Sequence, residues 1–328
     1  MDPFNVFRIY KNDKSISGVL EKTSLKDLDQ GDVVIRARYS SVNFKDALGA
    51  TGKGAIFKKF PIIGGIDVSG EIESSDNPKF KKGDPVLVTG CGLGENQDGG
   101  YSEFVRVPSE WIVPLPQNLS LEESMIYGTA GFTAAICLHR MVANGQNPDK
   151  GPIVVTGASG GVGSFAVMMM AKKGYEVHAI SGKKDSHDYL KTLGAHKVLS
   201  LEELELGGRS LEKGRFGGAI DNLGGDCLGR LIPHIKLWGN VASVGLVLGH
   251  ELNATVMPFI LRGVSLLGIS SANCPMDLRI KLWEMIAKEL KPSGLSDIVY
   301  KRVKLSELQG AFEGLLGRKV TGRILVEL

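Results

Sequence analysis

Cysteine is scarce in this chain of 328 residues, and its distribution excludes several classes of protein. The four cysteines, at positions 91, 137, 227 and 274, are widely scattered and form no C-x-x-C pair. A disulfide framework or a structural zinc lobe needs cysteines that are denser and more closely spaced. We therefore expect reduced thiols and a cytoplasmic protein.

Long apolar runs and dense runs of one charge are also missing. No apolar run reaches membrane-spanning length, and the first residues lack the apolar core of a secretion signal. The net charge of +3 comes without a dense basic run, which argues against a nucleic-acid partner. A hydrophobic content of 43% and a charged content of 23% are typical of a globular protein, and the length allows two domains.

The most informative stretch is an apolar run that breaks into glycines, IVVTGASGGVG, at residues 153–163. Residues 153–155 predict a short buried parallel strand, and residues 165–171 predict a helix that stops at Gly174. Glycines between strand and helix let the backbone turn sharply and approach a ligand. The first turn of such a helix suits a pyrophosphate, so the predicted cofactor contacts are Gly160, Gly161, Val162, Gly163 and Ser164. The spacing departs from G-x-G-x-x-G, and a purely structural turn is the alternative.

The surrounding pattern predicts an α/β fold of two domains. Alternating stretches at 33–39 and 101–107 indicate a β-rich domain over residues 1–125, completed by residues 292–328. Ser120 and Glu123 form a capping box that opens a helix leading into the second domain. Residues 126–291 alternate strand and helix, with strands expected at 153–155, 176–181, 197–199, 218–221, 240–244 and 264–269. This pattern predicts a doubly wound parallel sheet whose ligand lies at the carboxyl ends of the strands.

The end of the second strand of that sheet distinguishes NAD from NADP. An acidic residue there would bond the ribose hydroxyls, whereas cations and hydroxyls accept a 2′-phosphate. Ser181, Lys183 and Lys184 stand at this place, and no acid occurs before Asp185. Charge-assisted bonds to the phosphate favour NADPH as cofactor. An exposed turn with solvated lysines is the alternative.

Several motifs along nearly the whole chain resemble one known family. They are SSVNFKDAL, FPIIGGIDVSG, GGYSEFVRVP, YGTAGFTAA, VVTGASGGVGS, YLKTLGA, TVMPFILRGVSLLGI and the terminal GRILV. Together they resemble the medium-chain dehydrogenase/reductase superfamily, in its zinc-free quinone oxidoreductase division and its acrylyl-CoA reductase branch. The resemblance implies a GroES-like catalytic domain, a Rossmann NADP-binding domain, a cleft between them and a homodimer.

The resemblance also allows us to ask whether the chain has a zinc site. Zinc-containing relatives carry a G-H-E-x-x-G stretch, and this chain has residues 65–70, GIDVSG, with Ile66 in place of the histidine. The six histidines are scattered, and none pairs with a cysteine at ligand spacing. We expect no zinc, and we interpret Asp67 as a structural or hydrogen-bonding carboxylate.

Without a metal, hydride transfer needs donors for the substrate carbonyl and a source of protons. The resemblance places Asn43 beside the nicotinamide ribose, while a turn-capping asparagine is the alternative. The branch commonly shows N-Y-K-D where this chain has N-F-K-D, so Phe44 lacks a hydroxyl that could donate a proton. Water, Lys45 and Asp46 remain as candidate donors, and the predicted catalytic residues are Asn43, Lys45 and Asp46.

The remaining predicted cofactor contacts lie far apart in the sequence. The resemblance implies contacts from Thr129 and Arg323, for which a helix cap and a surface arginine are the alternatives. Leu246, Ser270 and Ser271 follow the fifth and sixth strands, at the edge where the nicotinamide is expected. The sequence thus predicts an NADPH-dependent, zinc-free reductase of activated C=C bonds, acting on acrylyl-CoA-like enoyl thioesters or quinones. An NADPH:quinone oxidoreductase without thioester activity and a non-catalytic NADPH-binding or sensing protein are the alternatives.

Overall fold

The computed structural model describes residues 3–13 and 15–328, which divide into two compact units. The described residues up to 129, together with residues 271–328, form the first unit, and residues 130–270 form the second. The first is β-rich and the second contains a parallel sheet, which confirms the predicted fold class. The units divide at 129/130 and 270/271, whereas the sequence placed the boundaries at 125/126 and 291/292.

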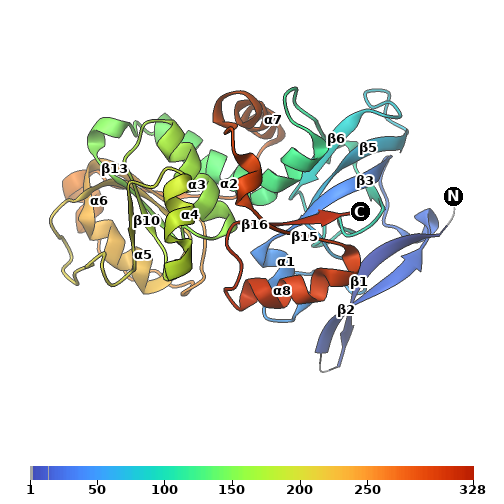
Figure 1. Cartoon of the computed structure of the whole chain (residues 1–328), viewed down its shortest axis with the longest axis horizontal. Helices are drawn as coiled ribbons and strands as arrows, with labels where there is room; N and C mark the ends of the chain where they lie inside the picture. The colour runs from blue at the N-terminus through green and yellow to red at the C-terminus, as the bar shows by residue number, and fades with distance from the viewer. Residues whose placement is uncertain (1–2, 14) are drawn as a thin grey trace. The chain divides into compact units, whose positions relative to one another are not determined.

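The first unit is built on two sheets. A three-stranded sheet has the order β2 (Ser15–Thr23), β1 (Phe4–Asn12) and β4 (Ile62–Ile63). The larger sheet has the order β15 (Val299–Val303), β16 (Arg323–Glu327), β3 (Val33–Val42), β5 (Asp67–Ser75), β6 (Pro85–Thr89) and β8 (Val113–Pro114), and β7 (Phe104–Val107) also pairs with β3. Helices α1 (Phe44–Ala50) and α8 (Leu308–Leu316) pack on each other (Figure 1). The ring of Phe312 lies 6.0 Å from those of Phe7 and Tyr101 in the shared core.

Helix α7 (Met276–Met285) belongs to the first unit, although the sequence placed it with the parallel sheet. The reason is a buried arginine in its first turn. Arg279 donates to the carbonyl of Thr89, at the end of β6, over 2.5 Å, and to the carbonyl of Ser271 over 2.8 Å. These bonds tie the helix to the larger sheet of the first unit.

Helix α2 (Leu121–Ala143) leads from the first unit into the second. The predicted capping box is confirmed, because the Ser120 N–H donates to the Glu123 carboxylate over 2.9 Å and the Glu123 N–H donates to Ser120 Oγ over 3.1 Å. At Gly128 the backbone leaves the helical region, with φ 47° and ψ −153°. The helix therefore bends just before Thr129.

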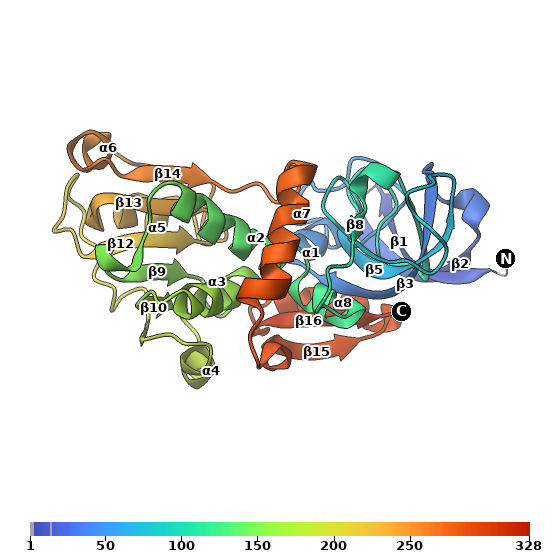
Figure 2. The ribbon, with the colours of Figure 1, turned by 90° about the horizontal axis from the view of Figure 1, so that it is seen from above.

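The second unit is a six-stranded parallel sheet. Its order is β11 (Lys197–Leu199), β10 (Val177–Ile180), β9 (Ile153–Thr156), β12 (Phe216–Asp221), β13 (Ile235–Ser243) and β14 (Ser265–Gly268). Figure 2 labels β10, β9, β12, β13 and β14. The helices are α3 (Gly161–Lys172), α4 (His187–Thr192), α5 (Gly225–Leu231) and α6 (Met257–Arg262). The strand order reverses between β9 and β12, where doubly wound sheets bind their ligands.

Shorter elements complete the chain. Single 3₁₀ turns occupy Leu25–Asp27, Ser109–Trp111, Pro148–Lys150, Lys184–Ser186, Ile232–His234, Leu295–Ile298 and Leu305–Glu307, and a π turn, Ile286–Leu290, extends α7. Within the described residues, no helix combines the length and the apolar character needed to cross a membrane.

Candidate active site

The centre of the polar site in the first unit is a carboxylate that the sequence analysis interpreted as structural or hydrogen-bonding. Asp67, the first residue of β5, is fully buried. Its oxygens accept hydrogen bonds from Ser41 Oγ over 2.6 Å and from Asn43 Nδ2 over 2.8 Å. They also accept from the N–H of Thr129 over 2.9 Å and from its hydroxyl over 2.6 Å. One carboxylate thus fixes two residues, Asn43 and Thr129, that are distant in the sequence.

Arg323 closes the same cluster from the start of β16. Its buried guanidinium donates to Ser41 Oγ over 2.7 Å, to Asn43 Oδ1 over 3.2 Å and to the Ile126 carbonyl over 3.0 Å. It lies 3.9 Å from the Asp67 carboxylate. Burial lowers the pKa of Arg323, and the nearby Asp67 acts in the opposite direction. We call Ser41, Asn43, Asp67, Thr129 and Arg323 the Asp67 network.

Gly128 makes room for this network. A Cβ atom at residue 128 would lie 2.5 Å from Asp67 Oδ2, 2.8 Å from Ser41 Oγ and 2.9 Å from Arg323 Nη2. Real Cβ atoms do not approach other atoms so closely, and the positive φ of 47° also favours glycine. The bend in α2 therefore lets the Thr129 N–H reach Asp67.

Asp46 lies beneath the Asp67 network and is 1% exposed. Its carboxylate accepts the N–H of Asn43 over 2.9 Å and the N–H of Ile66 over 3.1 Å. Burial, and next the negative charge of Asp67, raise its pKa to about 7. Burial also raises the pKa of the neighbouring Tyr101 well above its ordinary value, and that hydroxyl donates to the Ser41 carbonyl. The predicted catalytic residues Asn43 and Asp46 are thus both enclosed and hydrogen-bonded.

Lys45, the third predicted catalytic residue, stands apart from the network. Its ammonium pairs with Glu95 over 2.6 Å, on a partly exposed face of α1. Phe44 precedes it and is 39% exposed. The structure therefore separates Lys45 and Phe44 from the buried cluster that holds Asn43.

In the second unit the glycine turn, residues 157–163, follows β9 as predicted. Gly157 has φ 58°, and a Cβ at Gly163 would lie 2.3 Å from the Gly157 carbonyl oxygen. Helix α3 begins at Gly161, with Gly160 as its N-cap residue, four residues earlier than predicted. Gly161 and Val162 are half-buried. Ser164 is fully buried, and its hydroxyl donates to the Ala158 carbonyl over 3.4 Å.

The turn after β10 carries the predicted phosphate-binding residues. Ser181 is buried, and its hydroxyl contacts those of Ser159 and Ser186 over 3.1 and 2.9 Å. It also accepts the N–H of Lys183 over 3.2 Å. Burial lowers the pKa of Lys183, and Lys184 is exposed. Three serine hydroxyls thus shape the turn that presents both lysines.

The predicted residues after the later strands lie at the carboxyl edge of the sheet. Leu246 is 59% exposed, and its Cα would lie 3.1 Å from a Cβ on Gly224, in the turn after β12. Ser270 is exposed and ends the second unit. Ser271 is half-buried and already belongs to the first unit.

Sequence reasoning missed the connecting residues. It did not assign a role to Ser41, Ser159 or Ser186, and it did not link Asp67 to Asn43, Thr129 and Arg323. The available signals were Ser41, two residues before Asn43, and Ser159, inside the glycine turn. Neither signal indicates a partner, because each partner comes from a distant segment.

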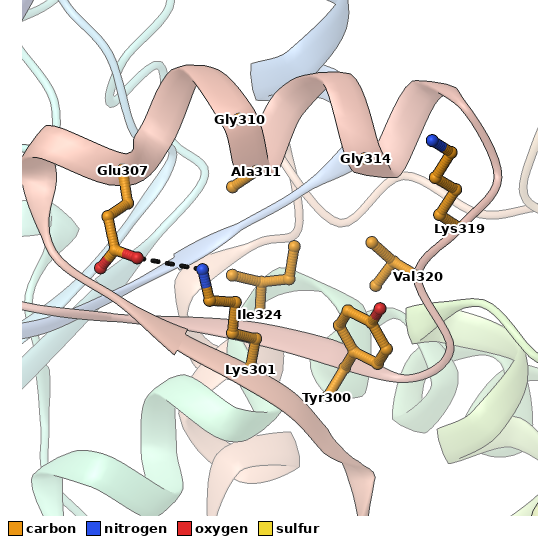
Figure 3. A pocket seen from close by; sticks show the side chains of 9 residues that line it. All are labelled: Tyr300, Lys301, Glu307, Gly310, Ala311, Gly314, Lys319, Val320 and Ile324. Carbon is orange, nitrogen blue, oxygen red and sulfur yellow. Dashed lines mark hydrogen bonds and ion pairs between the residues drawn. The ribbon is translucent and has the colours of Figure 1, made fainter.

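A separate cavity of about 450 Å³ lies between α8 and the β15–β16 pair (Figure 3). Ile324 lines it, and Lys301 and Glu307 form an ion pair over 3.0 Å at one end. Successive side chains on a strand point to opposite faces, so this cavity lies behind the network that Arg323 joins.

The comparisons with known proteins agree with this architecture. Residues 29–117 match the family described as alcohol dehydrogenase GroES-like domain, and residues 161–288 match the family described as zinc-binding dehydrogenase. The "Putative quinone oxidoreductase YhfP" of Bacillus subtilis is 47% identical over 99% of both chains. The acrylyl-CoA reductase AcuI of Ruegeria pomeroyi is 40% identical over 99% of both chains.

The chain belongs to the medium-chain dehydrogenase/reductase superfamily, in its quinone oxidoreductase branch. This confirms the resemblance that the motifs indicated. Two solved members of the branch have the same fold. The yhdH oxidoreductase of Salmonella enterica in complex with NADP is 40% identical, with a TM-score of 0.95 over 99% of both chains. Bacillus subtilis yhfP with NAD bound is 46% identical, with a TM-score of 0.97 over 100% of both chains.

Proposed function

We propose that this chain is an NADPH-dependent reductase of activated C=C bonds, with acrylyl-CoA-like enoyl thioesters as its leading substrates and quinones as a second class. The observation that carries the proposal is full-length similarity to an acrylyl-CoA reductase and to a protein named as a quinone oxidoreductase. The glycine turn after β9 fits the cofactor, because its backbone packs closely on itself at Gly163 and continues directly into the first turn of α3, where helix N–H groups suit a pyrophosphate.

The cofactor, when bound, supplies a hydride to the β-carbon of the substrate. In the second unit we assign its pyrophosphate to Gly160, Gly161, Val162 and Gly163, and its 2′-phosphate to Lys183 and Lys184. We assign Ser181 and Ser164, which are buried, to shaping the backbone around the bound cofactor. NADP is bound in the Salmonella enterica relative and NAD in the Bacillus subtilis relative, so the preference of this chain needs its own measurement.

In the first unit we assign Asn43 and Thr129 to contacts with the nicotinamide riboside, with Asp67 and Arg323 as positioning residues. Leu246, Ser270 and Ser271 are proposed to flank the nicotinamide. Asp46 is enclosed and accepts two backbone N–H bonds, so we assign it to holding the Asn43 loop.

We propose water as the proton source at the α-carbon. Lys45 is paired with Glu95, and Phe44 has no hydroxyl. Phe44→Tyr tests this assignment, because Phe44 is 39% exposed and a new hydroxyl can be hydrated. If a phenol can act as an acid there, turnover on thioesters should rise relative to quinones, by at most ~10². An unchanged ratio, with unchanged NADPH affinity, would show that residue 44 takes no part in protonation.

We propose that catalysis needs no zinc. Ile66 is buried, and Asp67 is fully engaged in hydrogen bonds. The described part of the chain holds no group of three His, Cys, Asp or Glu side chains placed to bind a metal. Purified protein should carry no stoichiometric zinc, and chelators should leave turnover unchanged. Zinc at one per chain, lost together with activity, would overturn this assignment.

We propose a homodimer that forms along β14 and works in the cytoplasm. β14 is the last strand of its sheet, and the neighbouring α6 exposes Ile260 (72%) and Leu261 (56%). An exposed apolar surface beside an open strand edge is suited to pairing with a second copy. Light scattering should give twice the chain mass, and Ile260→Glu should weaken the dimer.

All four cysteines are free, which fits a reducing compartment such as the proposed cytoplasm.

The test of the function is NADPH consumption with a panel of enoyl thioesters, quinones and alkenals. The proposal predicts turnover with short enoyl thioesters. Turnover with quinones alone would favour an NADPH:quinone oxidoreductase, and binding of NADPH without turnover on any acceptor would favour a sensing role.

A further inference from the structure

A buried side-chain oxygen without a partner lies where the strand order of the parallel sheet reverses. Asn222 directly follows β12, and Thr156 ends the adjacent strand β9. The Asn222 N–H donates to Thr156 Oγ1 over 3.0 Å, and Asn222 Nδ2 donates to the Thr156 carbonyl over 2.7 Å. Asn222 Oδ1 is buried and has no hydrogen-bond partner.

The orientation of this carboxamide is fixed by its neighbour. The Thr156 carbonyl can only accept a hydrogen bond, so the amide nitrogen of Asn222 must face it. The unpaired atom is therefore an acceptor, and it requires a donor. Buried polar atoms in folded proteins are nearly always paired, so an exception indicates a partner supplied from outside the chain.

Two donors in the segments next to Asn222 already have other acceptors. The N–H of Gly224 donates to Asp221 Oδ2 over 2.7 Å, and the Thr156 hydroxyl donates to Asp221 Oδ1 over 2.6 Å. On the other side lies the glycine turn, where a Cβ on Gly157 would be 3.3 Å from Asn222 Cβ. The unpaired acceptor thus lies beside the turn that we assign to the pyrophosphate.

The order of the strands indicates which part of a dinucleotide would reach it. The lysines assigned to the 2′-phosphate follow β10, on one side of β9. The pyrophosphate crosses at the start of α3, directly after β9. The remaining half of the molecule then extends over β12, where Asn222 lies. That half carries two ribose hydroxyls and an amide N–H, all of them donors.

We propose that Asn222 Oδ1 accepts a hydrogen bond from the nicotinamide riboside half of NADPH, from a ribose hydroxyl or the amide N–H. The inference rests on the proposed function, because it needs a dinucleotide at this edge of the sheet. Asn222 is then a positioning residue for the reactive half of the cofactor, and it leaves the adenosine half unaffected.

The test compares two ligands on two variants by calorimetry. Asn222→Ala should weaken NADPH binding by about tenfold, as expected for one lost hydrogen bond, and leave adenosine 2′,5′-bisphosphate binding within about twofold. Asn144→Ala is the matched control, because this carboxamide bonds Asn240, in the interior of β13, and Ser265, the first residue of β14, away from the carboxyl edge of the sheet. It should change neither affinity.

Several outcomes would overturn the inference. Unchanged NADPH affinity in Asn222→Ala would mean that a water molecule, and not the cofactor, donates a hydrogen bond to Asn222 Oδ1. Equal losses for both ligands would mean that Asn222 only supports the glycine turn through Thr156. If the parent protein binds neither ligand, the proposed function itself fails, and this result is distinct from the other two.

Two further measurements make the inference independent of how the variant folds. In a crystal structure of the parent enzyme with NADPH, a riboside hydroxyl or amide nitrogen should lie within hydrogen-bond distance of Asn222 Oδ1, and a water there instead would contradict the proposal. The acetylpyridine analogue of NADPH keeps the ribose hydroxyls and lacks the amide N–H. The loss caused by Asn222→Ala persists with this analogue if the donor is a hydroxyl, and disappears if it is the amide.

Discussion

In the first unit, the charged groups of the candidate site are buried and paired with one another, whereas the second unit keeps its polar groups at the edge of a sheet. The oxygens of Asp67 accept hydrogen bonds from residues of the chain, and Arg323 donates to four residues around it. The second unit offers a glycine turn, an exposed Lys184 and an unpaired oxygen on Asn222. The first arrangement suits rigid positioning of Asn43 and Thr129, and the second suits binding of an anionic ligand.

This difference makes the two regions respond differently to substitution. A change in the Asp67 network should act mainly on stability, because it leaves a buried charge or donor unpaired. A change at the edge of the parallel sheet should act mainly on ligand affinity. The following substitutions test this separation, beginning with the largest expected effect.

Asp67→Asn should destabilise the protein by about 3–5 kcal/mol, because Arg323 then stays buried without its counter-ion. Glu71→Gln is the matched control on the same strand, since Glu71 pairs with Arg38 on an exposed surface. That change should cost less than about 1 kcal/mol. Urea unfolding at pH 7.5 measures both, and similar losses would contradict the distinction between the buried and exposed pairs.

Asp46→Asn should change how stability depends on pH. The pKa of Asp46 is about 7 in the folded chain against an ordinary 3.8, so the folded state holds this proton more tightly. The resulting stability is fully present below pH 3.8 and is lost as the pH rises through 7. At about 1.4 kcal/mol per pKa unit, the loss reaches at most about 4 kcal/mol.

The parent should therefore lose stability relative to Asp46→Asn as the pH rises from 4 to 7, and the difference should be flat above that range. The charges that face Asp46 in the first unit are Asp67 and Arg323, and Tyr101 stays neutral throughout. Urea unfolding at several pH values measures the difference. A pH-independent difference would mean that Asp46 is ionised in the folded chain throughout this range.

Gly128→Ala should cost about 2–3 kcal/mol, because the new Cβ meets Asp67, Ser41 and Arg323 at less than 3.0 Å. Gly145→Ala serves as the comparison, because it also has a positive φ, 74°, but nothing lies within 4 Å of its Cβ. That change should cost about 1 kcal/mol, from the backbone alone. Thermal unfolding of both variants measures the contribution of the clash. Equal losses of stability would show that the side chains of the Asp67 network can move away from the new Cβ without destabilising the protein.

Lys183→Gln should reduce NADPH affinity by about tenfold, or 1.4 kcal/mol, and leave NADH affinity unchanged. The physical reason is the loss of a charge-assisted bond to the 2′-phosphate. Titration of cofactor fluorescence measures both constants. If the parent binds NADPH and NADH equally well, the assignment of the turn after β10 to the phosphate is wrong.

Local patterns in the sequence predicted the parallel sheet well. The run at 153–155 and the glycines after it specify β9 and the turn with little help from distant residues. The capping box at Ser120 is equally local. The start of α3 was misplaced because glycines are poor helix formers, and here they occupy its first turn.

The first unit was less predictable, because its site depends on contacts between distant segments. Asp67 and Thr129 are 62 positions apart, and Arg323 and Asn43 are 280 apart. The resemblance singled out Asn43, Thr129 and Arg323 one by one, but no spacing indicates that one carboxylate joins them. The contact of helix α7 with the first unit was also not predicted, since it depends on the bond from Arg279 to Thr89.

The most direct test of the central claim follows the hydride itself. The enzyme is incubated with NADPH carrying deuterium at the transferable position of the nicotinamide and with a short enoyl thioester. If the chain is such a reductase, one deuterium per turnover appears at the β-carbon of the saturated product, and the α-proton is drawn from water. NADPH that binds but transfers no deuterium to any acceptor would contradict the claim that this chain is a reductase.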